Sequence, residues 1–373
     1  MFKEKFLYNL ATDKYRGFMA SLIKALLFII SIIYGLAVRI LILFYRISPY
    51  RMDCKVISAG NITLGGTGKT SLVEYVARYL KSQGRKVAVL SRGYKRKIQN
   101  QKSLPAGQAG KIQNYETMGD EPYMLQTNLK DIPVIVDIDR IRAAKQAIKD
   151  YGVDTVILDD GLQQWKIRKD LEVVTIDATN PFGNQHLIPR GILREPTSSL
   201  KRADVFIITK TNLNPDIQDI ENVLSEINPA AQIIESMHRP LGFYEIDKQD
   251  ELLKLEILKA ETVTLISGIA DPDSFENLII NLGIKVGLSF RFPDHYYYSE
   301  EDLENIIKES QNKNIDTIVT TQKDAVRLQG LGVTPASPVG RGWGLRVLVL
   351  HIELKITKNE EEFHNRLLRL YNI

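Results

Sequence analysis

A glycine-rich stretch followed by a lysine and a threonine carries the clearest chemistry in this sequence. The stretch is GGTGKT, residues 65–70, and it lies between an apolar run at 56–60 and a helical pattern. Glycines let the backbone turn tightly and direct consecutive amide N–H groups inward, and the start of a helix adds the positive end of its dipole. The sequence therefore predicts a P-loop that binds the phosphates of a nucleotide.

The side chains of this stretch suit the same role. Lys69 is placed to reach the terminal phosphates, and the Thr70 hydroxyl to hold Mg²⁺. The common P-loop pattern has glycine six residues before the lysine, where this chain has Thr63, with Gly60 further upstream. The alternative is a turn without a ligand, but the preceding strand and the following helix favour a P-loop. The predicted nucleotide-binding residues are Gly65, Gly66, Thr67, Gly68, Lys69, Thr70 and Ser71.

Two aspartates supply a second part of a phosphoryl-transfer site. Asp159 and Asp160 end the apolar run VILDDG, as in a Walker B element, where a carboxylate reaches the metal or its water shell. The alternative is an ordinary Asp-Asp-Gly turn. Because the transition state spreads negative charge over the transferred group, a phosphate loop also needs such metal-binding carboxylates.

Two further stretches offer groups that handle protons. MGDEPYML contains Asp120 and Glu121 as candidates for base and metal shell, and FPDHYYYS contains Asp294 and His295. Each has a simpler alternative, since Asp-Glu-Pro is a common helix start and a single histidine is more often structural. A carboxylate neighbour can orient a histidine or raise its pKa for proton transfer. We predict that Asp120 and His295 act as a pair, although they are expected in different lobes.

Short apolar runs alternate with the helical patterns that must position these residues. Five runs follow the glycine loop, at 86–91, 133–137, 154–160, 171–177 and 204–209. They are continuously apolar and rich in β-branched residues, as is typical of parallel strands covered on both faces. Functional side chains gather where such strands end, and the glycine loop, SRGYKR, DDGLQ and TKTN all lie there.

The pattern starts again after about residue 215, with apolar runs at 262–268, 286–299, 316–328 and 345–354. We expect a linker around 211–260, where hinge motion would occur. The predicted fold class is α/β: a P-loop NTPase-like, mostly parallel sheet with helices on both faces, a smaller C-terminal α/β lobe and an N-terminal membrane helix. The expected domains are a membrane-associated helix at 1–50, a P-loop kinase domain at 51–215 and the smaller lobe at 216–373.

Two stretches read as loop insertions, at 97–114, where KIQN recurs, and at 332–344, which is rich in Gly and Pro. A third stretch, TQKD at 321–324, partly resembles the T-K-x-D-like motif with which some proteins recognise guanine at the end of a strand. Its residue order differs from that pattern, and we interpret it as a capped helix start.

The run ALLFIISIIYGLAVRILILF, residues 25–44, is long enough to cross a bilayer, since twenty residues of helix reach about 30 Å. Its only charge is Arg39, which fourteen Leu, Ile, Val and Phe residues outweigh. The absence of polar residues at helical spacing disfavours a buried core helix. Basic residues before the run disagree with a spanning helix and a cytoplasmic body, so spanning and lying in the inner leaflet are both open. These residues are Lys3, Lys5, Lys14, Arg16 and Lys24.

Composition excludes several other classes. The 373 residues are 44% hydrophobic and 25% charged, which is ordinary for a globular protein. The single cysteine, Cys54, excludes an internal disulfide framework and fits a reducing compartment. The net charge of +4 is small, and a membrane surface explains the basic N-terminal residues better than nucleic acid does.

The order of motifs GN-x-x-x-GGTGKT, SRGY, GDEP, DR-x-x-A, DDG-x-Q, LREP, TK-x-N, FPDH and KDAV resembles the tetraacyldisaccharide 4'-kinase family, the lipid A 4'-kinases of Gram-negative inner membranes. The resemblance extends from the N-terminal apolar run to about residue 328. The family's own loop begins GN-x-x-x-GG, which accounts for Thr63. The two insertions depart from the family pattern.

The resemblance implies that ATP donates its γ-phosphate to the 4'-hydroxyl of tetraacyldisaccharide 1-phosphate, giving lipid IVA. It implies ATP and Mg²⁺ as cofactors, with Lys69 and Thr70 binding them and Asp120 as the base acting with His295. It also implies that Thr70, Glu121, Asp159, Asp160 and Gln163 shape the metal site. The implied substrate-positioning residues are Arg92, Tyr94, Arg140, Arg194 and Glu195.

The expected partners are this lipid and the membrane, with no nucleic acid and no obligate protein partner. The expected location is the bacterial inner membrane, with the catalytic body on the cytoplasmic side. Two rival functions remain: a membrane-tethered P-loop ATPase or GTPase switch acting on a protein, and a kinase of a soluble substrate that the N-terminal helix only localises. Turnover that ignores added lipid would favour the first rival. Full activity toward a short-chain acceptor without residues 1–45 would favour the second.

Overall fold

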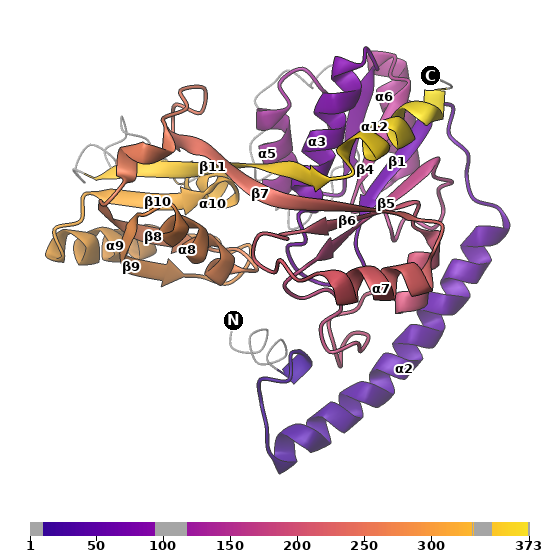
Figure 1. The fold of residues 1–373 in the computed structure, drawn as a ribbon, viewed down its shortest axis with the longest axis horizontal. Coiled ribbons are helices and arrows are strands. Elements are labelled where there is room, and N and C mark those ends of the chain that lie inside the picture. Colours follow the sequence, from indigo (N-terminus) through magenta and orange to yellow (C-terminus); the bar gives the residue numbers. More distant parts are fainter. Residues whose placement is uncertain (1–9, 94–117, 330, 332–344, 372–373) are drawn as a thin grey trace. The chain divides into compact units, whose positions relative to one another are not determined.

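The computed structural model describes residues 10–93, 118–329, 331 and 345–371. Its contacts group the chain into two compact units (Figure 1). Unit 1 comprises residues 1–92, 129–237 and 354–373, and unit 2 comprises 93–128 and 238–353. The boundaries of these units therefore differ from those of the predicted domains, because each unit combines segments that are distant in sequence. The two predicted insertions, at 97–114 and 332–344, lie outside the described residues.

Unit 1 is a parallel sheet covered by helices. The strand order is β3-β2-β4-β1-β5-β6-β7, and neighbouring strands pair in parallel. Its strands are β1 Lys55–Gly60, β2 Val87–Ser91, β3 Val134–Val136, β4 Thr155–Asp159, β5 Leu171–Asp177, β6 Val205–Thr209 and the first part of β7 Gln232–Glu245. Its helices are α2 Phe18–Ile47, α3 Lys69–Ser82, α6 Arg140–Tyr151, α7 Gln218–Ile227, α12 Glu360–Leu368 and the short 3-10 turns η1 Thr197–Arg202 and η3 Arg369–Tyr371.

Helices α6 and α7 bury two separate apolar clusters against this sheet. Ala143, Ala144 and Ala147 of α6 pack with Val156 and Leu158 of β4 in one cluster. Ile220 and Leu224 of α7 pack with strands β5 and β6 in the other, and the strand registers place both clusters on the same face. Every residue of β5 is buried, as expected for a parallel strand between two helical layers. The five predicted strands after the glycine loop are all present.

Unit 2 repeats this architecture on a smaller scale. Its strand order is β7-β11-β10-β8-β9, and the pairings of β10 with β11 and β8, and of β8 with β9, are parallel. The elements are α5 Asp120–Asn128, η2 Leu255–Leu258, β8 Thr262–Ser267, α8 Pro272–Asn281, β9 Lys285–Arg291, α9 Glu300–Asn312, β10 Thr317–Thr321, α10 Gln322–Gln329 and most of β11 Arg346–Lys358. Helices α9 and α10 contribute to one apolar cluster and α8 to another.

The region predicted as a linker is structured. Residues 211–260 contain α7, η2 and the fourteen-residue strand β7, and the boundary between the two units falls within them, after residue 237. The hinge motion expected there stays a prediction. The strand QIIESMHRPLGFYE interrupts its apolar residues with polar ones and contains Pro240 and Gly242. Such a sequence lacks the continuous apolar run by which the other strands were identified.

Helix α2 contacts unit 1 along one narrow stripe. Its buried residues are Ser31, Gly35, Val38 and Ile42, spaced as one face of a helix. The other faces remain apolar and exposed, including Ile33 at 65% and Phe44 at 66% of their accessible surface. Among the described residues, α2 is the one helix that is long enough and apolar enough to cross a membrane. By itself this is weak support for membrane association.

Candidate active site

The glycine loop forms the expected turn between β1 and α3. Gly68 is the N-cap of α3 in the left-handed region, with φ of 80°, and Lys69 is the first helical residue. Gly65 also has positive φ, at 115°, and a Cβ there would meet no atom within 4 Å. The turn therefore needs glycine for its backbone and leaves open space beside it. This geometry fits a phosphate-binding loop.

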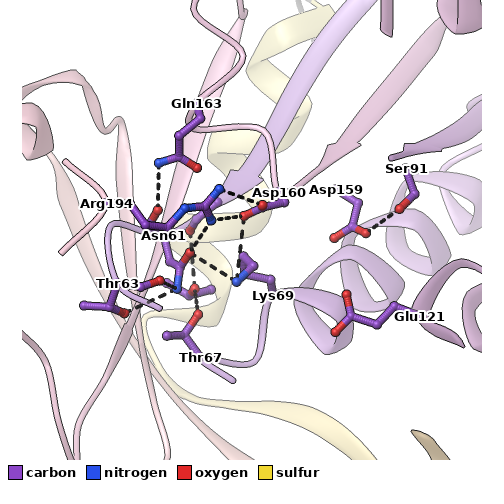
Figure 2. Close-up of polar contacts among 12 residues, drawn as sticks. Asn61, Thr63, Thr67, Lys69, Ser91, Glu121, Asp159, Asp160, Gln163 and Arg194 are labelled. Carbon is purple, nitrogen blue, oxygen red and sulfur yellow. Dashed lines mark hydrogen bonds and ion pairs between the residues drawn. The ribbon is translucent and has the colours of Figure 1, made fainter. Parts of the chain in front are cut away.

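Lys69 is held by groups that phosphate oxygens could replace. Its Nζ donates a hydrogen bond to Asn61 Oδ1 at 3.1 Å and lies 3.8 Å from Asp160 Oδ1 (Figure 2). The fully buried Asn61 donates in turn to the Thr63 carbonyl at 2.8 Å. Asn61 and Thr63 thus position the lysine, which explains why Thr63 can stand where other P-loops have glycine. Asn61 was missed as a site residue, although it belongs to the GN motif.

Two threonines fasten the loop to neighbouring strands. The hydroxyl groups of Thr67 and of Thr175 on β5 are 2.8 Å apart, and the Thr67 carbonyl accepts from the hydroxyl of Thr209 on β6 at 3.1 Å. Thr70 is buried in the first turn of α3, and Ser71 follows it half-buried. The loop is therefore rigidly connected to the sheet at the ends of its strands, where functional groups of parallel sheets gather.

The two aspartates after β4 differ in their surroundings. Asp159 is buried and accepts a hydrogen bond from Ser91 Oγ at 2.9 Å (Figure 2). Asp160 adopts positive φ, at 55°, and pairs with both terminal nitrogens of Arg194 at 2.7 and 2.9 Å. Burial raises the pKa of Asp160, but Lys69, Arg194 and Arg140 lower it more, and the net shift is downward. Asp160 therefore stays ionised between two cations.

Arg140 is a buried cation at the start of α6. Its side chain is 2% exposed and donates to the carbonyl of Asp137. Burial lowers its pKa to about 10 while the carboxylates of Asp159 and Asp160 oppose the shift. Within the described part of the chain, its Nε has no hydrogen-bond partner. A buried guanidinium with a spare donor is suited to a phosphate oxygen.

Glu195 is enclosed by donors from the protein itself. It is fully buried and accepts from Gln163 Nε2 at 3.0 Å, Trp165 Nε1 at 3.1 Å and Arg202 at 2.7 Å. Gln163 also donates to the Asn61 carbonyl at 3.2 Å (Figure 2). These contacts give Glu195 and Gln163 a supporting position behind the phosphate loop. Their predicted roles, toward substrate and metal respectively, stay predictions.

Asp120 and His295 form a direct pair within unit 2. His295 Nδ1 and Asp120 Oδ2 are 2.7 Å apart. The pairing agrees with the prediction, but the expectation that the two residues lie in different lobes was wrong, since segment 93–128 belongs to the same unit as His295. The helix-start reading of Asp-Glu-Pro also holds, because Asp120 is the first residue of α5.

The pair favours a carboxylate next to an imidazolium. Burial raises the pKa of Asp120, but the hydrogen bond and charge of His295, with Arg327 and Lys323, bring it down to about 2. Burial lowers the pKa of His295, whereas Asp120 and its acidic neighbours raise it more strongly. The proton therefore resides on the imidazole at pH values below its ordinary pKa of about 6.5.

Helix α10 supports this pair with buried charges that the sequence did not mark as site residues. Arg327 is 3% exposed, and its Nε lies 3.5 Å from Asp120 Oδ2. The fully buried Asp324 accepts from the Gly268 amide at 3.0 Å and from the Tyr298 hydroxyl at 2.7 Å. Lys323 pairs with Glu121. The KDAV motif marked this segment in the sequence, but it did not indicate what these residues do.

The helix start predicted at TQKD is confirmed. The amide of Asp324 donates to the Thr321 hydroxyl at 3.1 Å, and α10 begins at Gln322. Of the predicted substrate residues, Arg92 lies exposed directly after β2. Tyr94 lies outside the described residues.

The described residues contain no group of three or more His, Cys, Asp or Glu placed to hold a metal ion. Mg²⁺ usually keeps several waters and is held by one or two carboxylates together with substrate phosphates. Asp159 and Asp160, side by side after β4 and close to the phosphate loop, fit that mode of binding.

Comparisons with known proteins agree with this geometry. The family model described as tetraacyldisaccharide-1-P 4'-kinase matches residues 23–372. A tetraacyldisaccharide 4'-kinase of Halothermothrix orenii is 33% identical over 377 residues, covering 97% of each chain. Another, of Elusimicrobium minutum, is 37% identical over 283 residues, covering 74% of each.

A solved structure extends the similarity to the fold. The crystal structure of the "apo" form of LpxK from Aquifex aeolicus in complex with ATP has a TM-score of 0.72 and 27% identity, covering 94% of this chain and 99% of that chain. This match confirms the predicted α/β fold class with an N-terminal apolar helix. Motifs, site geometry and comparisons agree, and the chain belongs to the tetraacyldisaccharide 4'-kinase family.

Proposed function

We propose that this protein transfers the γ-phosphate of ATP to the 4'-hydroxyl of tetraacyldisaccharide 1-phosphate, giving lipid IVA. The observation that carries the proposal is the phosphate loop with Lys69 between Asn61 and Asp160, in a chain whose relatives bear this activity in their names. The Aquifex aeolicus structure contains ATP, which supports ATP as the donor here.

The groups around the loop divide the work of holding the nucleotide. The loop amides and Lys69 bind the phosphates. Arg140 offers an oxygen its Nε, which has no hydrogen-bond partner among the described residues. Thr70, Asp159 and Asp160 would hold Mg²⁺, with Glu121 and Gln163 as predicted outer groups. When bound, the metal neutralises charge on the transferred group.

Asp120 is the proposed base, and His295 orients it. A carboxyl group with a pKa of about 2 is a weak base. A loose phosphoryl-transfer transition state tolerates this weakness, because the acceptor hydroxyl becomes acidic only after its oxygen begins to bond phosphorus. The neighbouring imidazolium and Arg327 keep the carboxylate ionised, so it is ready to accept a proton at neutral pH.

The remaining arginines are proposed to bind the acceptor and the phosphates. Arg194 presents a planar guanidinium beside Asp160, and Arg92 is exposed at the end of β2. Tyr94 is proposed as a further acceptor contact on sequence alone. Glu195 would act indirectly, because it is fully buried and its carboxylate accepts from Gln163, Trp165 and Arg202.

We further propose that residues 1–50 associate with the cytoplasmic face of the inner membrane. The middle of α2, at Ser31 to Ile42, packs against protein while its other faces expose large apolar side chains. A helix flanked by protein at its midpoint suits a position along the membrane surface better than a fully spanning one. Its lipid acceptor could then be reached by diffusion within the membrane plane.

The test is transfer of label. Purified protein is incubated with γ-labelled ATP, Mg²⁺ and tetraacyldisaccharide 1-phosphate, and the label is then located on the sugar. Label at the 4' position is expected. A protein that hydrolyses nucleotide at the same rate with or without lipid, and labels none of it, would be the membrane-tethered switch instead.

A further inference from the structure

Helix α2 is fastened to one particular loop of unit 1, residues 183–194, which we call the docking loop. A Cβ at Gly35 would come within 2.5 Å of Leu187 Cδ1, so the helix backbone approaches the loop closely. Phe28 packs edge-on against His186 with ring centroids 5.5 Å apart. The segment before α2 joins the same loop, because Asp13 pairs with Arg190 at 3.0 Å.

The end of the docking loop is bonded to the phosphate loop. The amide of Arg194 donates to the Ile62 carbonyl at 2.6 Å, and the amide of Leu64 donates to the Ile192 carbonyl at 2.8 Å. Thr63 and Leu193 form an antiparallel bridge between these bonds. The backbone that carries Arg194 therefore pairs with the residues that lead into the glycine turn.

One side chain of α2 bonds directly to this pairing. The Tyr34 hydroxyl donates to the Arg194 carbonyl at 2.8 Å. Burial raises the pKa of Tyr34, with Arg194 opposing and Glu195 adding to the shift, so the phenol keeps its proton and remains a donor. The Arg194 side chain then reaches Asp160 and Asn61, the two groups that hold Lys69 (Figure 2).

We propose that Tyr34 is a positioning residue for phosphoryl transfer: through the Arg194 carbonyl, the apolar helix fixes the Arg194 side chain, which holds Asp160 and Asn61 beside Lys69. Helix α2 is then a structural part of the active site as well as a membrane anchor. This inference rests on the proposed function, because it assigns the helix a part in the same reaction.

The test is Tyr34→Phe, which removes one hydroxyl and keeps the ring. Transfer is measured with γ-labelled ATP and saturating tetraacyldisaccharide 1-phosphate in detergent micelles. We expect kcat/KM for ATP to fall roughly three- to ten-fold, as one well-placed hydrogen bond would give. The matched control is Tyr45→Phe, the same change on the same helix, where the ring contacts Phe44 and Lys166. It should keep the wild-type value.

A double-mutant cycle separates positioning from general stability. If Tyr34 acts through Arg194, Tyr34→Phe should change the residual activity of an Arg194→Ala variant by less than two-fold. Losses that multiply independently would overturn the proposal. Wild-type kinetics for Tyr34→Phe, with or without a lowered Tm, would also overturn it.

The two proposals fail in different ways. If the wild-type protein labels no lipid, the proposed function is wrong and the cycle has no activity to compare. If the wild type labels the 4' position while Tyr34→Phe and Tyr45→Phe are both indistinguishable from it, only the positioning role is wrong.

Discussion

Lys69 lies close to oxygen atoms of Asn61 and Asp160. These groups hold the ammonium where phosphate oxygens would bind it, so little side-chain ordering is left for the moment of binding. Preorganisation of this kind is effective because the partners are themselves fixed: Asn61 by Thr63, and Asp160 by Arg194.

Lys69→Ala should therefore abolish transfer while membrane association is retained. The cation that reaches the terminal phosphates is lost, but the apolar surface of α2 is untouched. Labelled-phosphate transfer and sedimentation with vesicles measure the two properties separately. The control is Lys81→Ala, on the same helix as Lys69, which removes an exposed ion pair with Asp131. This variant should stay active. Turnover of the Lys69 variant near the wild-type rate would exclude the P-loop assignment.

Asp120 and His295 should behave as one unit in kinetics. Each alanine variant is expected to lower kcat by roughly 10²- to 10⁴-fold with little change in the KM for ATP, since proton removal and not nucleotide binding is impaired. The double variant should be little worse than the poorer single variant. Single-turnover rates of the four proteins provide the comparison. Independent multiplication of the two losses would make His295 a structural residue.

The same pair should stabilise the fold over a limited pH range. The pKa of Asp120 is lowered to about 2, so its contribution is present above the unfolded value of about 4 and is lost as pH falls toward 2. The pKa of His295 is raised, so its contribution is complete below about 6.5 and is lost as pH rises through the folded value. The Tm difference between wild type and His295→Gln should be largest between about pH 4 and 6.5.

His364 provides a control of opposite sign for this titration. Burial lowers its pKa, with Glu360 opposing, so the folded state loses stability as pH falls through the unfolded value of about 6.5. The Tm difference between His364→Gln and wild type should therefore be smaller at low pH than at neutral pH. Parallel curves for the two variants would contradict the assignment of the Asp120 and His295 charges.

At the scale of elements, α10 ties the pair of Asp120 and His295 to the rest of unit 2. Arg327 donates to the carbonyls of Gly268 at 3.0 Å and Tyr296 at 3.2 Å, and it lies 3.4 Å from Asp324. His295 itself has positive φ, at 58°, and its amide donates to the Gly268 carbonyl at 3.2 Å. The loop that carries the histidine is thus held in an uncommon backbone conformation by a buried ion pair.

Arg327→Met should accordingly lower the free energy of unfolding by about 3 to 5 kcal/mol, because it removes the cation beside the fully buried Asp324 and one of the cations near Asp120. Urea denaturation measures this change. Arg239→Met removes an arginine paired with Glu353 at an exposed position of the same unit and should cost less than about 1 kcal/mol. Equal losses for the two variants would show that Arg327 contributes no more than a surface pair.

Helix α2 should be the element that holds the protein on membranes. Replacing Ile32 and Ile33 by Asp is expected to release it, since each charge costs about 2.5 to 3.5 kcal/mol within the apolar layer. Both side chains are more than half exposed, at 56% and 65%, so the fold should tolerate the change. Sedimentation with vesicles in high salt is the measurement, and Val223→Asp, an exposed position on α7, is the control. Continued sedimentation would mean that another surface binds the membrane.

The sequence predicts elements well where one physical signal dominates. Continuous apolar runs identified β2, β4, β5 and β6, and the Thr321 cap identified the start of α10. Strand β7 carries mixed polar and apolar residues, so neither a period of two nor an apolar run revealed it. Contacts between distant parts of the chain could not be predicted from such local signals. Asp120 and His295 are 175 positions apart, and only the packing of distant segments brings them together.

At the scale of the whole molecule, site residues depend on segments that sequence order separates. Asn61, Asp160 and Arg194 come from three different connections of unit 1, and their convergence follows from strand order β4-β1-β5. The residue types could be inferred from motifs. Their hydrogen-bond partners could not, because Asn61, Tyr34 and Arg327 carry no local signal of burial or of the groups they face.

The segmented construction of unit 1 has a consequence for synthesis. Residues 354–373 belong to this unit, and Tyr79 of α3 stacks on His364 of α12 with ring centroids 3.8 Å apart. These residues leave the ribosome about 300 positions after α2, a delay of roughly 15 to 60 s at 5 to 20 residues per second. During that interval the apolar N-terminal helix belongs to a unit 1 that is still incomplete. Early capture by the lipid surface would shelter it from aggregation, so the nascent chain would reach the membrane before its nucleotide-binding unit could close.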